Sequence, residues 1–144
     1  MKVISLTEPF ATIIKNGYKK IETRSWKTSY RGELYIHASS TKIPKKWKEN
    51  KELMALAGSN LSYGKIICKC QLVDCIEMTK ENIEKIKKEK PTEYLCGIYE
   101  EGRYAWILEN IKPLETPIEA KGHLGIWNYE GKEEKDYDNS KLSK

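Results

Sequence analysis

The segment from Lys65 to Ile76 constrains the fold more than any other part of the chain, because apolar side chains occupy both sets of alternating positions. In an extended chain, successive side chains point to opposite faces. Ile66 and Leu72 therefore lie on one face, with Ile67 and Val73 partly on the other. A strand that is apolar on both faces is covered from both sides. The segment predicts a long central strand, around which the rest of the fold is built.

Shorter segments complete the expected sheet. They combine β-branched or aromatic residues with alternating polarity, and they comprise residues 3–6, 18–27, 33–38, 104–110 and 125–129. The intervening stretch 111–122 contains two prolines and a glycine and is expected to be an irregular connection.

Short helices are expected between these strands. Thr7 is a candidate N-cap for a helix that Asn16-Gly17 ends. A second helix is expected over residues 44–57, and a surface helix rich in Lys and Glu begins after the candidate cap Thr79 and ends near Lys88. Because short helices do not alternate regularly with the strands, a doubly wound parallel sheet is disfavoured. The sequence predicts an α+β fold, a small mixed β-barrel of five to six strands with peripheral short helices.

The chain has 144 residues, the length of one domain. Residues 1–129 carry the strand and helix patterns, whereas residues 130–144 are charged, lack periodicity and are expected to be a disordered tail. No apolar run reaches the roughly 18 residues of a membrane span. The N-terminus also lacks the apolar core of a signal peptide, so a cytoplasmic location without membrane association is expected.

The net charge of +5 arises from 26 basic and 21 acidic residues. This excess permits a polyanionic partner but does not require one, since a lysine-rich surface also serves solubility. No metal or other cofactor is predicted. Four cysteines lack zinc-ligand spacing, the two histidines lie far from them in the sequence, and buried free thiols are expected instead at Cys68, Cys70, Cys75 and Cys96.

Polar and aromatic side chains are concentrated between Gly17 and Trp26. Glu22 and Arg24 share one face of the expected strand, and Lys19 lies at its start. Such a cluster offers a planar guanidinium and a point charge to an anionic ligand, with Trp26 placed to stack on a base. The alternative is a solvated edge strand whose exposed ion pairs contribute only about 0–1 kcal/mol.

The spacing Gly17-x-Lys19-x-x-Glu22-x-Arg24 resembles the G-x-K-x-x-E-x-R signature of the ASCH (activating signal cointegrator homology) domain, a branch of the PUA-like superfamily. The resemblance extends over about residues 3–129. Further matching motifs follow in the family's order: Pro9-Phe10-Ala11, Ser25-Trp26-x-Thr28-x-x-Arg31-Gly32, Ile36-His37-Ala38-Ser39, Leu72-Val73-Asp74-Cys75, Trp106-x-Leu108-Glu109-Asn110 and Lys121-Gly122-x-x-Gly125-x-Trp127. Phe10 stands where many members carry Trp, so the apolar ring is kept but the indole donor is lost.

This resemblance implies a PUA-like barrel with a cleft lined by the signature, and a role in RNA binding. The binding hypothesis is that the cleft holds RNA through a nucleotide or one flipped base, or holds a free nucleoside or nucleotide. The candidate ligand-binding residues are Phe10, Lys19, Glu22, Arg24, Ser25, Trp26, Tyr30, His37 and Ser39. For His37, the competing interpretation is a half-buried strand residue bonded to the backbone. The oligomeric state is not predicted.

Some members of the family are hydrolases that cleave N4-acetylcytidine, and ribonuclease activity also occurs in the family. The enzyme hypothesis assigns catalysis to Lys19 and Glu22. A desolvated Lys19, its pKa lowered by burial, would activate water, and Glu22 would move the proton. Glu22 stands where the acetylcytidine-cleaving relatives carry Thr, so the sequence departs from their catalytic set at that position.

Overall fold

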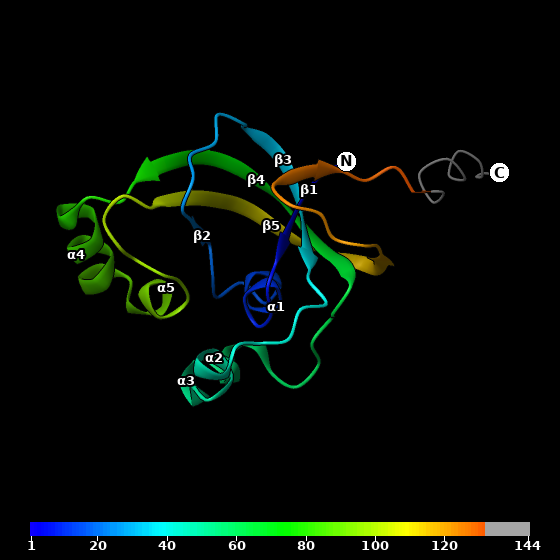
Figure 1. Cartoon of the computed structure of the whole chain (residues 1–144), viewed down its shortest axis with the longest axis horizontal. Coiled ribbons are helices and arrows are strands. Elements are labelled where there is room, and N and C mark those ends of the chain that lie inside the picture. The colour runs from blue at the N-terminus through cyan, green and yellow to red at the C-terminus, as the bar shows by residue number, and fades with distance from the viewer. Residues whose placement is uncertain (132–144) are drawn as a thin grey trace.

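The computed structural model describes residues 1–131, which form one six-stranded sheet with short helices around it (Figure 1). The strand order is β2-β5-β4-β3-β1-β6, and β4 lies near the middle as predicted. β1 and β3 are parallel and all other neighbours are antiparallel. The strands are β1 (Lys2–Leu6), β2 (Ile21–Arg24), β3 (Gly32–Ala38), β4 (Lys65–Glu77), β5 (Tyr104–Glu119) and β6 (Ile126–Asn128). The sheet curls into a half-barrel, which confirms the α+β, barrel-like expectation.

β5 corrects one expectation, because the stretch predicted to be irregular continues the strand to Glu119. Long-range pairing with β4 overrides the local proline signal: Pro113 lies opposite Cys68, and Ile118 lies opposite Ile66. The register of this ladder shifts in several places, including between Ile66 and Cys68. Such irregularities are where a sheet accommodates proline, which has no N–H to donate.

The helices are α1 (Phe10–Lys15), α2 (Lys45–Lys48), α3 (Lys51–Ala57), α4 (Lys80–Glu89) and α5 (Pro91–Leu95). Thr7 does not cap α1, which was the expectation. The buried carboxylate of Glu8 reaches into the first turn instead and accepts hydrogen bonds from the backbone N–H of Thr12 at 2.9 Å and of Ser62 at 3.0 Å. A carboxylate satisfies the free N–H groups of a helix start as a capping side chain does.

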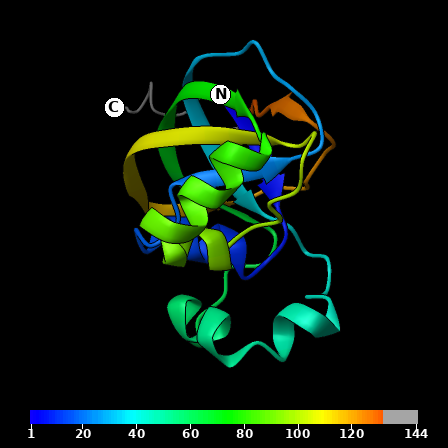
Figure 2. The same cartoon turned by 90° about the vertical axis from the view of Figure 1, so that its left-hand side faces the viewer.

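The helix expected over residues 44–57 is two helices, because the side chain of Asn50 accepts from the N–H of Leu53 and starts a new one. The predicted cap Thr79 is confirmed at the start of α4, where its hydroxyl accepts from the N–H of Asn82 at 3.1 Å. α5 was not predicted; it begins at Pro91, shortly after the helix that was expected to end near Lys88. Figure 2 shows α4 and α5 on one side of the sheet, with α2 and α3 below them.

The main core fills the concave side of the sheet. Trp106 is fully buried there with Leu34, Ile36 and Leu72, and α1 closes the core through Ile14. All four cysteines are free thiols, and three of them are buried as expected, whereas Cys75 is only half-buried. Within residues 1–131, no helix is both long and apolar enough to cross a membrane. Most of the predicted tail, residues 132–144, lies outside the described residues.

Candidate functional site

Two adjoining cavities lie beside the signature segment. The first, called here the signature cavity, measures about 210 Å³ and is lined by Ser5, Leu6, Thr7, Phe10, Lys19, Glu22, Thr23, Arg24, Pro44, Trp47, Cys96, Gly97, Ile98 and Arg103. The second measures about 420 Å³ and shares Ser5, Thr7 and Arg24 with the first. Arg24 therefore lies where the two cavities meet. The signature residues line a concavity and not a flat, solvated strand face.

Lys19 is at the floor of the signature cavity, with only 1% of its surface exposed. Gly17 adopts a positive φ of 89° after α1 and lets the chain turn inward at this point. The Lys19 Nζ donates to the carbonyl oxygens of Ile21, at 2.6 Å, and Cys96, at 2.5 Å, and lies 3.6 Å from Glu22 Oε1. An ammonium has three N–H donors and no acceptor. Three acceptors around Nζ therefore match a protonated lysine that ties β2 to the loop after α5.

Glu22 lies between two cations. One carboxylate oxygen faces Lys19, and the other lies 3.0 Å from Arg24 Nε in an electrostatic contact without a hydrogen bond. Arg24 Nη2 donates to the backbone carbonyl of Ser5 at 2.9 Å. Within residues 1–131, its other terminal nitrogen, Nη1, has no hydrogen-bond partner. The guanidinium is thus fixed on one edge and free to donate to a ligand on the other.

Arg103 is a site residue that the sequence interpretation missed. Its Nε donates to the carbonyl of Ile98 at 3.0 Å and its Nη2 to the carbonyl of Thr23 at 3.2 Å, but no carboxylate of the described residues pairs with it. The described lining of the cavity therefore holds three cations against the single carboxylate of Glu22. One signal was available in the sequence: Arg103 is one of only three arginines in a lysine-rich chain.

An aromatic wall faces these charges. The rings of Phe10 and Trp47 meet edge to face, with centroids 5.2 Å apart, and Lys19 Nζ lies 5.4 Å from the centre of the Phe10 ring. No local pattern in the sequence places Trp47 in a cavity with the signature. The site thus combines an excess of positive charge with two half-buried aromatic rings.

Glu93 fixes the entry of β2. Its carboxylate is 8% exposed and accepts hydrogen bonds from the N–H groups of Lys20, at 2.6 Å, and Ile21, at 3.2 Å. Burial raises the pKa of Glu93, while these hydrogen bonds and the charge of Lys19 oppose that rise. The contact attaches α5 to the segment that carries the signature.

Ser25, Trp26 and Tyr30 line neither cavity. β2 ends at Arg24, and the chain then turns so that the Trp26 ring packs edge to face on Trp106, with centroids 4.8 Å apart. The Tyr30 hydroxyl donates to the carbonyl of Glu33 at 2.6 Å, and Ser25 is exposed. The structure therefore does not bring these three predicted ligand residues to the other members of the site.

His37 and Ser39 line the second cavity, next to Arg24. His37 is fully buried. Its Nε2 donates to the carbonyl of Ala120 at 2.7 Å. Its Nδ1 is then left to accept from the hydroxyl of Ser5, and these two atoms are 3.0 Å apart. Burial lowers the pKa of His37 below its ordinary value of 6.5, although the bond to Ala120 opposes this. Both ring nitrogens are engaged, and the bond to Ala120 agrees with the interpretation of a strand histidine held by the backbone.

The fold and the site together define a small α+β domain with a cationic, aromatic-walled cavity. A family model described as the ASCH domain matches residues 4–118, and the chain belongs to the ASCH domain family. The chain is 26% identical over 141 residues to activating signal cointegrator 1 of Homo sapiens and 27% identical over 135 residues to that of Mus musculus. Each match covers 90% of this chain and 22% of the relative, so the chain spans about a fifth of their length.

Solved structures show the same fold. The crystal structure of ASCH from Zymomonas mobilis superposes with a TM-score of 0.56 at 17% identity, covering 94% of this chain and 90% of that one. A variant of the same protein gives a TM-score of 0.51 at 18% identity, covering 82% and 74%. At such identities the likeness establishes the fold. The expected family and its PUA-like architecture are therefore confirmed.

Proposed function

We propose that the signature cavity binds one unpaired base of a single-stranded RNA, with Arg24 and Arg103 recognising its polar edge or the adjoining phosphate. The observation that carries this proposal is the pair of guanidinium groups without a dedicated carboxylate on their outer edges, in a cavity that the rings of Phe10 and Trp47 also line. Splayed-out RNA bases are recognised by hydrogen bonds to their edges and by stacking on aromatic side chains or guanidinium planes.

The sizes of the two cavities support a single base. Pockets for drug-sized ligands measure about 300–1,000 Å³, whereas the signature cavity is about 210 Å³. The second cavity, about 420 Å³, meets it at Arg24 and offers room for the ribose and phosphate attached to that base. A free nucleotide would fit the same arrangement, because it carries the same base, ribose and phosphate as one unit of an RNA strand.

The hydrolase alternative has less support. A general base needs an unprotonated nitrogen with a free lone pair close to the reacting water. The environment of Lys19 Nζ consists instead of two carbonyl oxygens and a carboxylate, which hold an ammonium in place. Incubation with N4-acetylcytidine tests this alternative: deacetylation that is lost in Lys19→Ala, with the variant still folded, would replace the binding proposal with an enzymatic one.

Fluorescence anisotropy with short labelled single-stranded RNA tests the binding proposal. Arg24→Ala and Arg103→Ala are each expected to weaken binding about tenfold or more, since hydrogen bonds to charged groups contribute about 1.5–3 kcal/mol. Lys88→Ala, an exposed lysine on α4, is the matched control and should change the affinity less than about twofold. Loss of a phosphate contact should also reduce the salt dependence of binding. Absence of binding at low salt, or equal affinity in all three variants, would contradict the proposal.

A further inference from the structure

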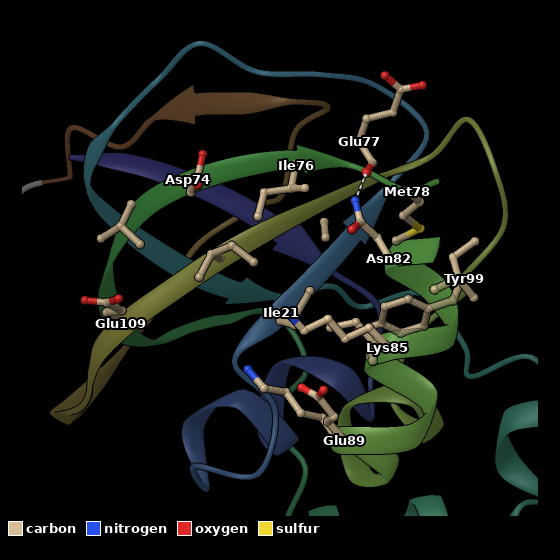
Figure 3. A pocket seen from close by; sticks show the side chains of 16 residues that line it. Ile21, Asp74, Ile76, Glu77, Met78, Asn82, Lys85, Glu89, Tyr99 and Glu109 are labelled. Atoms are coloured by element: carbon tan, nitrogen blue, oxygen red, sulfur yellow. Dashed lines mark hydrogen bonds between the residues drawn. The ribbon is translucent and has the colours of Figure 1, made fainter. Parts of the chain in front are cut away.

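A third cavity lies on the other face of the sheet, between α4 and strands β2, β5 and β4 (Figure 3). It measures about 530 Å³ and shares no lining residue with the two cavities beside the signature. On β5 its wall is formed by Ala105 and Ile107, whereas Trp106 and Leu108 face the main core. We call this space the α4 groove. Its apolar lining consists of Ile21, Val73, Ile76, Met78, Ile83, Ile86, Ala105 and Ile107.

The groove exists because α4 is attached to the sheet at its first turn, whereas the rest of the helix packs only loosely against the strands. The Asn82 side chain donates to the carbonyl of Glu77 at 3.0 Å, which attaches the first turn to the end of β4 (dashed in Figure 3). No residue of α4 is fully buried, and Ile83 and Ile86 are half-buried beside Met78. On the sheet side, Val73 and Ile76 remain 40% exposed. Adjacent apolar side chains left open on both walls mark a binding surface.

Tyr99 supplies an unpaired polar group at the end of this groove. Its side chain is only 9% exposed, yet its hydroxyl makes no hydrogen bond within the part of the chain that the structure describes. Figure 3 shows the ring reaching from its loop toward Ile21 on β2, and on one side it stacks on Tyr94. Burial, and secondarily the nearby charge of Glu93, raises the pKa of Tyr99, so the hydroxyl keeps its proton as a donor. A buried donor without an acceptor is costly and rare in folded proteins.

The charges around the groove restrict what enters it. Four carboxylates, those of Asp74, Glu77, Glu89 and Glu109, outnumber Lys85 and Lys90 among the lining residues. This excess of negative charge disfavours nucleotides, phosphates and fatty-acid carboxylates. The groove therefore differs from the signature cavity in the ligand it accepts, in size, sign of charge and polarity.

We propose that the α4 groove binds a small, neutral and largely apolar molecule whose single hydrogen-bond acceptor pairs with the Tyr99 hydroxyl. The volume of about 530 Å³ is within the range of small-molecule pockets. Such pockets are mostly apolar, with a few polar groups that fix the orientation of the ligand. The site is independent of RNA binding and does not involve Lys19, Arg24 or Arg103.

A pair of probes with the same shape tests this inference. 2-Acetylnaphthalene carries a carbonyl acceptor, and 2-ethylnaphthalene replaces it with a methylene group. Binding of each is measured from backbone amide shifts in ¹H–¹⁵N spectra. We expect shifts at α4, β4 and the loop around Tyr99, and a roughly fivefold preference for the ketone from one additional hydrogen bond. In Tyr99→Phe, which keeps the ring, the preference should fall below about twofold.

Two further variants locate the site. Ile76→Asp places a charge on the groove wall and should weaken both probes, whereas Leu124→Asp alters an apolar residue that is 98% exposed elsewhere and should weaken neither. An unchanged preference in Tyr99→Phe, or the absence of shifts along α4 with both probes, would overturn the proposal. Shifts of the same amides that grow with protein concentration alone would also overturn it, because a second copy of the chain would then occupy the groove.

Discussion

The signature cavity and the α4 groove lie on opposite faces of the same sheet and are built on opposite principles. In the signature cavity, Lys19 pairs with Glu22 and donates to two backbone carbonyl groups. Only the outer edges of the two arginine guanidinium groups are left to bind a ligand. In the α4 groove the walls are apolar, and one buried hydroxyl has no partner. The comparison teaches that burial alone does not define the role of a polar group. The fully paired Lys19 stabilises the fold at one site, whereas the unpaired Tyr99 hydroxyl is left for recognition at the other.

The largest expected effect comes from removing the buried ammonium. Lys19→Met leaves the carbonyl groups of Ile21 and Cys96 without a donor and Glu22 with Arg24 as its remaining partner, and should lower the free energy of unfolding by about 3 kcal/mol. Urea denaturation measures the change. Lys20→Met, at the exposed neighbouring lysine, is the control and should stay within about 0.5 kcal/mol. A loss below about 1 kcal/mol for Lys19→Met would remove the structural role assigned to this lysine.

An intermediate effect is expected at Gly97, which lies between the two regions. A Cβ atom built at this position would be 2.8 Å from Thr23 Cγ2 and 3.0 Å from Tyr99 Cε1. Gly97→Ala should therefore destabilise the fold by about 1–3 kcal/mol through overpacking, and Gly97→Val by more. It should also shift the amide signals of both regions. If only one region responds, the two sites are less closely coupled through this loop than the contact distances indicate.

The smallest effect on stability is expected at Tyr99. Tyr99→Phe removes a buried hydroxyl that has no partner among the described residues, so the free energy of unfolding should stay the same or rise by up to about 1 kcal/mol. Thermal and urea unfolding measure this change. A destabilisation above about 1 kcal/mol would mean that the hydroxyl is hydrogen-bonded in solution, and the contrast between the two regions would disappear.

The sequence indicated the central strand and the signature because both depend on local spacing. Alternation along Lys65 to Ile76 identified β4, and Gly17 with Lys19, Glu22 and Arg24 identified the segment that lines the cavity. The half-barrel sheet followed from counting strand segments that are separated by short helices. The central strand and the signature could each be predicted because the residues that define each of them are close together in the sequence.

The missed features depend on contacts between distant segments. Arg103 and Trp47 reach the cavity from a loop and a short helix that no local pattern connects to the signature. The extension of β5 through Pro113 depends on its pairing with β4. Trp26 was predicted to lie within the strand over residues 18–27, but β2 ends at Arg24 and the alternation of side chains ends with it. Sequence periodicity does not state where an element stops.

The central claim is that the signature cavity is a cationic recognition site. Titration of the ¹⁵N-labelled protein with cytidine 5′-monophosphate tests it most directly, since the cavity itself reports the binding. The predicted result is a set of saturable amide shifts at residues 19–24, 96–98 and Trp47, weakened by Arg103→Ala. Shifts confined to other surfaces, or saturable shifts that Arg103→Ala leaves unchanged, would contradict the claim.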